Sequence, residues 1–234
     1  MSLATEIPIP KALDDAFAKE WSFLAAPGTW FSGGERVEIA AEARRAMTES
    51  LSDDRRGAQA VSGEPSASRP ERMAGEPAGE GLPPALRDVV DMVASSSPLI
   101  DADWVAGLDE RNVTLPAYAE IIGIASRMSA VDFFHRALGL PLPPLPEPQA
   151  GEPTLLPPPT DLIVGKSFLP MVPPVSIPQT ISLVPPETQA WQALSDATYM
   201  TFDEMGDPDL SRSLHRTQIE LVAARTSQVN ECFY

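Results

Sequence analysis

Three residues near the end of the chain have the types and the spacing that thiol chemistry needs. Cys232 is the only cysteine among the 234 residues, and Glu220 lies twelve positions before it. The thiolate rather than the thiol is the nucleophile, and a place in the first turn of a helix lowers the pKa of a thiol. Asn230 is a good N-cap residue and would put Cys232 in such a first turn. The segment Glu220–Cys232 therefore indicates a helix that runs into a redox motif.

The elements that position these residues must include a break between two helices. In one continuous helix, Glu220 and Cys232 would lie about 18 Å apart along the axis, too far for direct proton transfer. A turn near Asn230 would bring the cysteine back toward the helix of the glutamate. We therefore expect a final helix from about Leu210, followed by a turn and the start of another helix.

Apolar residues at three- and four-residue spacing predict helices along most of the remaining chain. Gly139 has the residue type of a helix C-cap. The only candidate for a strand is the short run Leu162–Val164. We therefore predict an all-α protein built of helical repeats. Its expected helices before the final one cover residues 12–24, about 32–50, 82–93, 101–108, 116–138 and 187–202.

Two stretches lack the apolar pattern of a helical core. Residues 52–81 are expected to be disordered, because they cannot bury enough apolar surface to offset their ordering entropy. Residues 141–186 hold most of the 26 prolines and are expected to form a polyproline II linker, with SH3-type binding as an open possibility. The predicted organisation is a helical repeat at 1–140, a linker at 141–186 and the start of a second repeat at 187–234.

The net charge, the apolar runs and the cysteine and histidine content limit the classes of partner and the cellular compartment that we expect. A net charge of −16 disfavours nucleic acids and anionic membranes as partners. No apolar run approaches the roughly 18 residues of a membrane span, and the first 20 residues lack a signal peptide. One cysteine excludes an internal disulfide framework and fits a cytoplasmic protein. His135 and His215 lie far apart, so no metal site is predicted, and no cofactor motif is present.

Two segments of the chain resemble each other. Glu38–Ser50 and Glu220–Cys232 both begin with glutamate and an aliphatic residue, continue through alanines, and place a glutamate directly before the last residue. Repeats of this kind indicate two copies of one structural unit. The first copy ends in Ser50 where the second has Cys232, so only the second could carry thiol chemistry.

The spacing of Glu220 and Cys232, with a motif that begins Cys-x-x, resembles the two-repeat form of the AhpD-like alkyl hydroperoxidase and carboxymuconolactone decarboxylase family. The resemblance implies that Glu220 is a proton-relay glutamate and Cys232 the first, resolving cysteine of a Cys-x-x-Cys motif. The second, peroxide-attacking residue and a histidine would follow Tyr234. We therefore expect the chain to be truncated within the motif, at a selenocysteine codon that standard translation reads as a stop.

Two functions remain open on these grounds. The full-length protein would be a thiol- or selenol-dependent peroxidase, with a hydroperoxide substrate, a dithiol reductant protein and a homo-oligomeric assembly, while the truncated chain would be inactive. The alternative is a catalytically inactive helical module for interaction or structure, which Ser50 in the first copy favours. Truncation also predicts that residues 187–234 pack poorly or expose an apolar surface, because Trp191, Tyr199 and the final helix would lack packing partners.

Overall fold

The computed structural model describes residues 9–47 and 81–229 of the chain. Its secondary structure is helical, with no β-strand among these residues, which confirms the all-α prediction. The chain divides into two compact units, Met1–Leu194 and Ser195–Tyr234, called unit 1 and unit 2 below. The stretch predicted to be disordered lies outside the described residues except for Gly81. None of the described helices is both long and apolar enough to cross a membrane.

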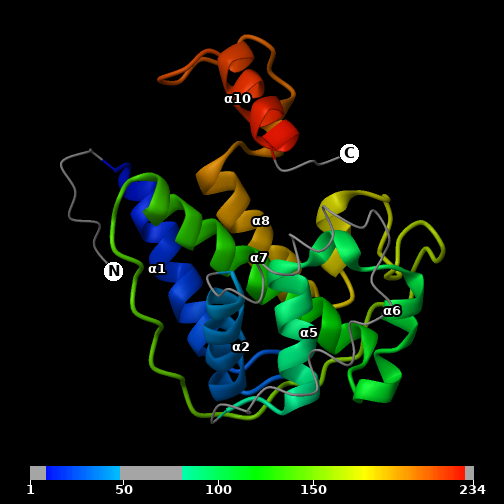
Figure 1. Ribbon diagram of the computed structural model, residues 1–234. Coiled ribbons are helices and arrows are strands. Elements are labelled where there is room, and N and C mark those ends of the chain that lie inside the picture. The colour runs from blue at the N-terminus through cyan, green and yellow to red at the C-terminus, as the bar shows by residue number, and fades with distance from the viewer. Residues whose placement is uncertain (1–8, 48–80, 230–234) are drawn as a thin grey trace, which may run out of the picture. The chain divides into compact units, whose positions relative to one another are not determined.

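The core of unit 1 lies among four helices, α1 (Lys11–Ala25), α2 (Gly33–Ala46), α5 (Pro84–Ser95) and α7 (Leu115–Ala137) (Figure 1). Helix α2 packs against α5 and α7, and α1 packs against α2 and α7. Ala40, Ala43 and Ala46 of α2 are fully buried, and small residues of this kind allow neighbouring helices to approach closely. The larger buried side chains of this core include Phe17, Leu24, Ile39, Val89, Ile121 and Met128.

The helix starts follow from capping residues. Ser32 and Glu35 form a capping box at the start of α2: the Ser32 hydroxyl accepts from the Glu35 amide at 3.3 Å, and the Glu35 carboxylate accepts from the Ser32 amide at 2.8 Å. Thr114 caps α7 in the same way, by accepting from the Ala117 amide. Gly139 follows α7 with a φ of +67°, the left-handed conformation that the sequence predicts for a C-cap.

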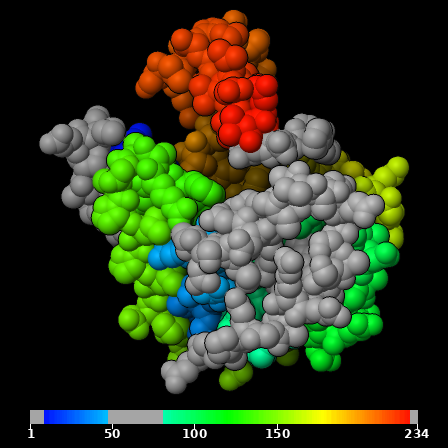
Figure 2. All heavy atoms as spheres, viewed as in Figure 1, coloured from blue at the N-terminus to red at the C-terminus, as the bar shows by residue number. Residues whose placement is uncertain are grey.

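The Pro-rich stretch after α7 is bound to unit 1. Residues 140–159 contain no helix or strand, and their backbone hydrogen-bonds to the first two helices and the turn between them. The Trp21 indole nitrogen donates to the Pro144 carbonyl at 2.8 Å, and Arg44 donates to the Pro143 carbonyl at 2.9 Å. The Gln149 amide donates to the Ala25 carbonyl at 2.8 Å. In Figure 2 the Pro-rich stretch, coloured green, lies at the surface next to blue atoms of the N-terminal helices.

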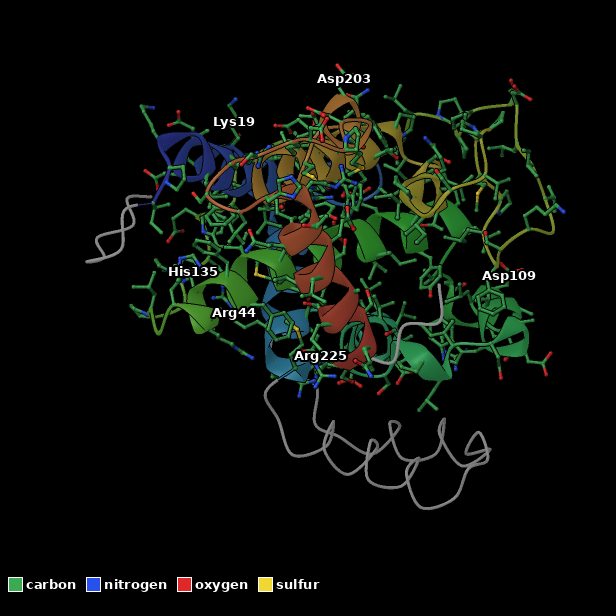
Figure 3. The ribbon with its side chains drawn as sticks, turned by 90° about the horizontal axis from the view of Figure 1, so that it is seen from above. Lys19, Arg44, Asp109, His135, Asp203 and Arg225 are labelled. Atoms are coloured by element: carbon green, nitrogen blue, oxygen red, sulfur yellow. The ribbon has the colours of Figure 1, made fainter. Side chains whose placement is uncertain are left out.

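This attachment corrects the expectation of a spacer for that part of residues 141–186. Extended proline-rich backbone has no internal hydrogen bonds, so its carbonyls are available to donors such as Trp21 and Arg44. Arg44, labelled in Figure 3, also reaches from α2 to Asp132 on α7 with two hydrogen bonds of 2.8 Å. One side chain therefore links α2, α7 and the Pro-rich stretch.

The chain returns to the helical core before α8 (Pro185–Thr198). The predicted strand is reduced to a single β-bridge between Ile163 and Met171. The short 3-10 helix η3 (Ile177–Ile181) packs against α7, and Leu183 and Val184 are buried directly after it. The start of α8 is thus held in unit 1. Unit 1 also contains the short helix α6 (Ala102–Ala106) and two 3-10 turns, η1 (Ser97–Leu99) and η2 (Asp109–Arg111).

Unit 2 contains the end of α8 and the helices α9 (Phe202–Met205) and α10 (Arg216–Val229). The helix predicted over residues 187–202 corresponds to α8 and ends earlier, at Thr198. Thr201 and Glu204 then form a second capping box that starts the separate helix α9. The final helix begins at Arg216 rather than near Leu210. Ser211 and His215 are joined there by a β-bridge, which is incompatible with helix over those residues.

Candidate functional site

Glu220 lies in the first half of α10 and is held by two neighbouring side chains. Its Oε1 atom accepts hydrogen bonds from Arg216 Nε at 2.8 Å and from the Tyr199 hydroxyl at 3.2 Å. Arg216 precedes it by four residues, a spacing that places both side chains on one face of the helix. The side chain of Glu220 is 46% exposed. Its carboxylate is therefore fixed in place and still open to a proton donor or acceptor.

Arg216 at the start of α10 and Arg212 in the loop before it bind the other elements of unit 2. Arg216 Nη1 donates to the carbonyls of Glu204 and Met205 at 3.0 and 2.9 Å, at the end of α9. Arg212 donates to the Tyr199 carbonyl at 3.0 Å and to the Glu204 carboxylate at 2.5 Å. These bonds satisfy carbonyls that a helix end leaves without partners. They also fix Tyr199 relative to Glu220.

The protonation of two neighbours of Glu220 is set by their surroundings. Burial first, and then the hydrogen bond to Glu220, raise the pKa of Tyr199, so its hydroxyl stays protonated and donates to the carboxylate. The hydrogen bond from Arg212 lowers the pKa of Glu204 to about 2, with help from the backbone of Thr201. Glu204 is therefore ionised at neutral pH, and Tyr199 is the neutral donor of the group.

Helix α10 buries none of its residues. Leu221, Val222 and Val229 are 70%, 59% and 66% exposed. The expected apolar surface is therefore present on α10, which carries Arg225 in Figure 3. The same expectation is wrong for residues 187–200, where Leu194 and Met200 are buried.

The other predicted site residue, Cys232, lies outside the described residues, as do Asn230 and Ser50. The structure therefore places Glu220 but gives no distance to the thiol. The first copy of the repeat can be compared at its glutamate: Glu38 is exposed on α2. The residues that follow differ, since Ile39 and Ala40 are fully buried whereas their counterparts Leu221 and Val222 are exposed.

Unit 1 contains a second group of interacting polar side chains, which sequence reasoning missed. Five charged residues from four helices meet in its interior, and we call them the charge cluster. Each of them is buried. They are Glu20 on α1, Arg36 on α2, Glu120 and Arg127 on α7, and Glu187 on α8.

Glu187 occupies the centre of the charge cluster. Its Oε1 accepts from Arg36 Nη1 at 2.8 Å, and its Oε2 accepts from Arg127 Nη1 at 2.6 Å. Each guanidinium has a further carboxylate partner: Arg36 pairs with Glu120, and Arg127 Nε donates to Glu20 at 2.8 Å. Because buried charges are tolerated only when paired and hydrogen-bonded, this arrangement attaches the start of α8 to α1, α2 and α7.

Glu120 also organises the turn between α1 and α2. Its Oε2 accepts from the backbone amides of Thr29 and Trp30, at 3.2 and 2.7 Å. Space for the carboxylate comes from Gly28, where an added Cβ would lie 1.9 Å from Glu120 Oε1. Gly123 has the same role for Glu187, whose Oε2 would lie 2.4 Å from an added Cβ. The absence of a side chain at these two glycines leaves room for the two carboxylates.

An aromatic ring completes the charge cluster. The guanidinium carbons of Arg36 and Arg127 lie 4.7 and 5.1 Å from the centroid of the Phe23 ring, within the range of cation–π attraction. Arg36 Nε and Arg127 Nη2 are buried without a hydrogen-bond partner among the described residues. The ring therefore provides favourable contact for both guanidiniums where a hydrogen bond is missing.

Some partners of Glu220 and some members of the charge cluster could have been predicted from the sequence. Arg216 stands four residues before Glu220, which is the spacing of a helical ion pair. Glu120 and Arg127 stand seven residues apart within the apolar stripe of α7, which indicates charges that face inward. Tyr199 gives no such signal, because its approach to Glu220 depends on the loop between α9 and α10.

Neither histidine belongs to a site. His135 is buried beside Phe17 and Phe134, and its Nδ1 lies 2.8 Å from the Val131 carbonyl oxygen. His135 is therefore a packed residue of the core. His215 is exposed just before α10, with its Nδ1 3.0 Å from the Thr217 hydroxyl. In the described part of the chain, no three His, Cys, Asp or Glu residues form a group that could hold a metal ion.

The two sites thus differ in kind: Glu220 is an accessible carboxylate on a helix before a cysteine, and the charge cluster is a closed interior network. The chain matches no protein-family model, no curated protein and no solved structure.

Proposed function

We propose that the full-length protein is a thiol- or selenol-dependent peroxidase of the AhpD type, in which Glu220 relays protons and Cys232 is the resolving thiol. One observation carries the proposal: a fixed, accessible Glu220 stands on a helix twelve residues before the only cysteine of the chain. A general base must be held in position and must remain reachable by the proton that it takes up. Glu220 meets both requirements.

The length of α10 sets a geometric requirement on this function. Residues 216–229 form one continuous helix, so Glu220 and Val229 lie about 13 Å apart along its axis. Cys232 can approach Glu220 only if the chain turns back after Val229. The predicted N-cap at Asn230 would provide this turn and would place the thiol at a helix N-terminus, where the thiolate is favoured.

The chemistry of the proposed site is a two-electron reduction of a hydroperoxide. The attacking thiolate or selenolate, expected three positions after Cys232, takes an oxygen from the hydroperoxide, releases the alcohol and becomes a sulfenic or selenenic acid. The Cys232 thiolate then attacks that atom, so that an S–S or S–Se bond forms and water leaves. A dithiol reductant protein reduces the bond and is oxidised to a disulfide. Glu220 accepts the proton of the thiol and returns it to the leaving oxygen.

Turnover of tert-butyl hydroperoxide with a dithiol donor tests the proposal on the full-length protein. We expect Glu220→Gln to lower the turnover rate by about a hundredfold, because general-base catalysis is lost. Cys232→Ser should abolish turnover that depends on the dithiol. The matched control is Glu38→Gln, which changes the equivalent exposed glutamate of the first copy and should leave the rate unchanged. Equal rates for wild type and Glu220→Gln would contradict the assignment of Glu220.

The second candidate is an interaction or structural module without catalysis, and the exposed apolar residues of α10 favour it. Leu221, Val222 and Val229 present to solvent a surface of the kind that helices normally bury against a partner. A homo-oligomer, which the peroxidase proposal also includes, would cover such a surface. The turnover measurement separates the two, because a module without catalysis gives no dithiol-dependent turnover in any variant.

A further inference from the structure

The charges of the buried cluster do not balance if every group is ionised. Three carboxyl groups, Glu20, Glu120 and Glu187, face two guanidinium groups, Arg36 and Arg127. Full ionisation would leave one negative charge in excess at a place from which solvent is nearly excluded. Isolated buried charges are costly, and carboxyl groups in such places take up a proton instead. The cluster therefore favours one retained proton.

Hydrogen bonding identifies the carboxyl group that keeps this proton. Glu187 accepts from both guanidiniums, and Glu120 accepts from Arg36 and from two backbone amides. Glu20 accepts one hydrogen bond, from Arg127 Nε to its Oε1. Each donated hydrogen bond favours the ionised form of a carboxyl group. Glu20 has the fewest such bonds and is the group most easily protonated.

The groups that face Glu20 from the elements packed around it act in opposite senses. Arg127 on α7 and Arg36 on α2 favour its ionised form, and Glu187 on α8 opposes it. Burial is the largest influence and raises the pKa of Glu20. Burial and Glu187 also raise the pKa of Glu120, as expected for coupled groups that share one proton.

We propose that Glu20 holds a proton at neutral pH, and that its ionisation at alkaline pH weakens the attachment of α8 to unit 1. The reason is that ionised Glu20 adds a third negative charge beside Glu187, the only member of the cluster on α8. Glu187 then shares the two guanidiniums with two competing anions. The strength with which the charge cluster holds the start of α8 therefore depends on the protonation of Glu20.

The direction of the pH effect follows from linkage. The pKa of Glu20 is higher in the folded chain than its usual value of 4.5, so between the two values the folded state binds more protons than the unfolded state. The stability that protonated Glu20 contributes is fully present below 4.5 and is lost as the pH rises through the raised value. Within that window the unfolding equilibrium constant should rise about tenfold per pH unit relative to a variant without this group.

The test is to measure thermal unfolding and infrared spectra of the wild type and of Glu20→Gln between pH 5 and 9. Glutamine imitates the neutral form, so the midpoint at pH 7 should change by no more than about 2 °C, and the fall in stability toward high pH should become shallower. The wild type in D₂O at pH 7 should show the carbonyl stretch of a buried protonated carboxyl group. This band should be absent in Glu20→Gln and present in Glu120→Gln.

Three results would overturn the proposal. They are the absence of a protonated-carboxyl band in the wild type at pH 7, the loss of the band in Glu120→Gln but not in Glu20→Gln, and a Glu20→Gln protein that does not fold at pH 7. The infrared measurement on the wild type needs no variant, so it decides the question even if a substitution disrupts folding. Glu152→Gln, at an exposed glutamate, is the control that should change neither the band nor the pH profile.

Discussion

Replacing Glu187 by glutamine is expected to lower the free energy of unfolding of unit 1 by about 3–5 kcal/mol. The substitution keeps the size of the side chain and removes the charge that both Arg36 and Arg127 contact. Its amide group can accept a hydrogen bond from one guanidinium but presents a donor to the other. At the guanidinium that meets this donor, a charge-assisted hydrogen bond is replaced by a repulsive contact, which is the costly way to break a buried ion pair. Urea unfolding at pH 7, monitored by circular dichroism, measures the difference in the free energy of unfolding between the variant and the wild type.

The exposed glutamate Glu152 supplies the matched control for this experiment. Glu152→Gln removes the same charge from the surface of unit 1 and should change the free energy of unfolding by no more than about 0.5 kcal/mol. Glu187→Gln and Glu152→Gln have the same net charge, so a difference in stability between them reflects the buried position of the Glu187 carboxylate. A loss for Glu187→Gln as small as that of the control would show that the cluster contributes nothing to the attachment of α8.

A methyl group at Gly33 should destabilise unit 1 by about 3 kcal/mol, at the upper end of overpacking effects. An added Cβ would lie 2.3 Å from the Ala25 carbonyl oxygen and 2.5 Å from the Gln149 carbonyl oxygen. Both are backbone atoms, so neither can rotate away. Relief requires that the end of α1 or the Pro-rich stretch move, at the place where the Gln149 amide bonds to Ala25. Chemical denaturation of Gly33→Ala measures the cost.

The adjacent glycine, Gly34, provides a matched control for this prediction. At Gly34 an added Cβ would meet only the Ser32 hydroxyl, at 3.9 Å. Gly34 lies within α2, where alanine is favoured over glycine by about 0.5–1 kcal/mol. Gly34→Ala should therefore stabilise the protein slightly while Gly33→Ala destabilises it. If the two variants were equally stable, the Pro-rich stretch would not be packed against the start of α2.

The helices of unit 1 could be predicted from sequence because each has a regular apolar stripe and a recognisable end. The predicted segment 12–24 became α1, and residues 116–138 became α7, to within a residue or so at each end. Residues 141–155 could not be placed, since an extended proline-rich chain has no periodic pattern. Its position depends on donors such as Trp21 and Arg44 that lie more than ninety residues away in sequence.

The sites were less accessible to sequence reasoning than the fold. A lone charge on a helix usually faces solvent, so the sequence does not distinguish Glu20 and Arg127 from ordinary exposed residues. Only their contacts in the folded chain show that they belong to a cluster. Glu220 was selected by its spacing from Cys232, and the structure adds two partners, Arg216 and Tyr199. Of these, the arginine could be predicted from helical spacing. The tyrosine could not, because it reaches Glu220 from a different element.

The most direct test of the central claim is the rate of alkylation of Cys232 as a function of pH. In the 234-residue chain Cys232 is the only thiol, so iodoacetamide reports on it without any substitution, and the same chain unfolded in urea provides the reference. If Cys232 lies at a helix N-terminus beside Glu220, its reaction should follow a pKa below the ordinary thiol value of about 8.5, and Glu220→Gln, which removes a neighbouring negative charge, should shift the profile to lower pH. A profile identical to that of the unfolded chain, and unchanged by Glu220→Gln, would contradict the claim.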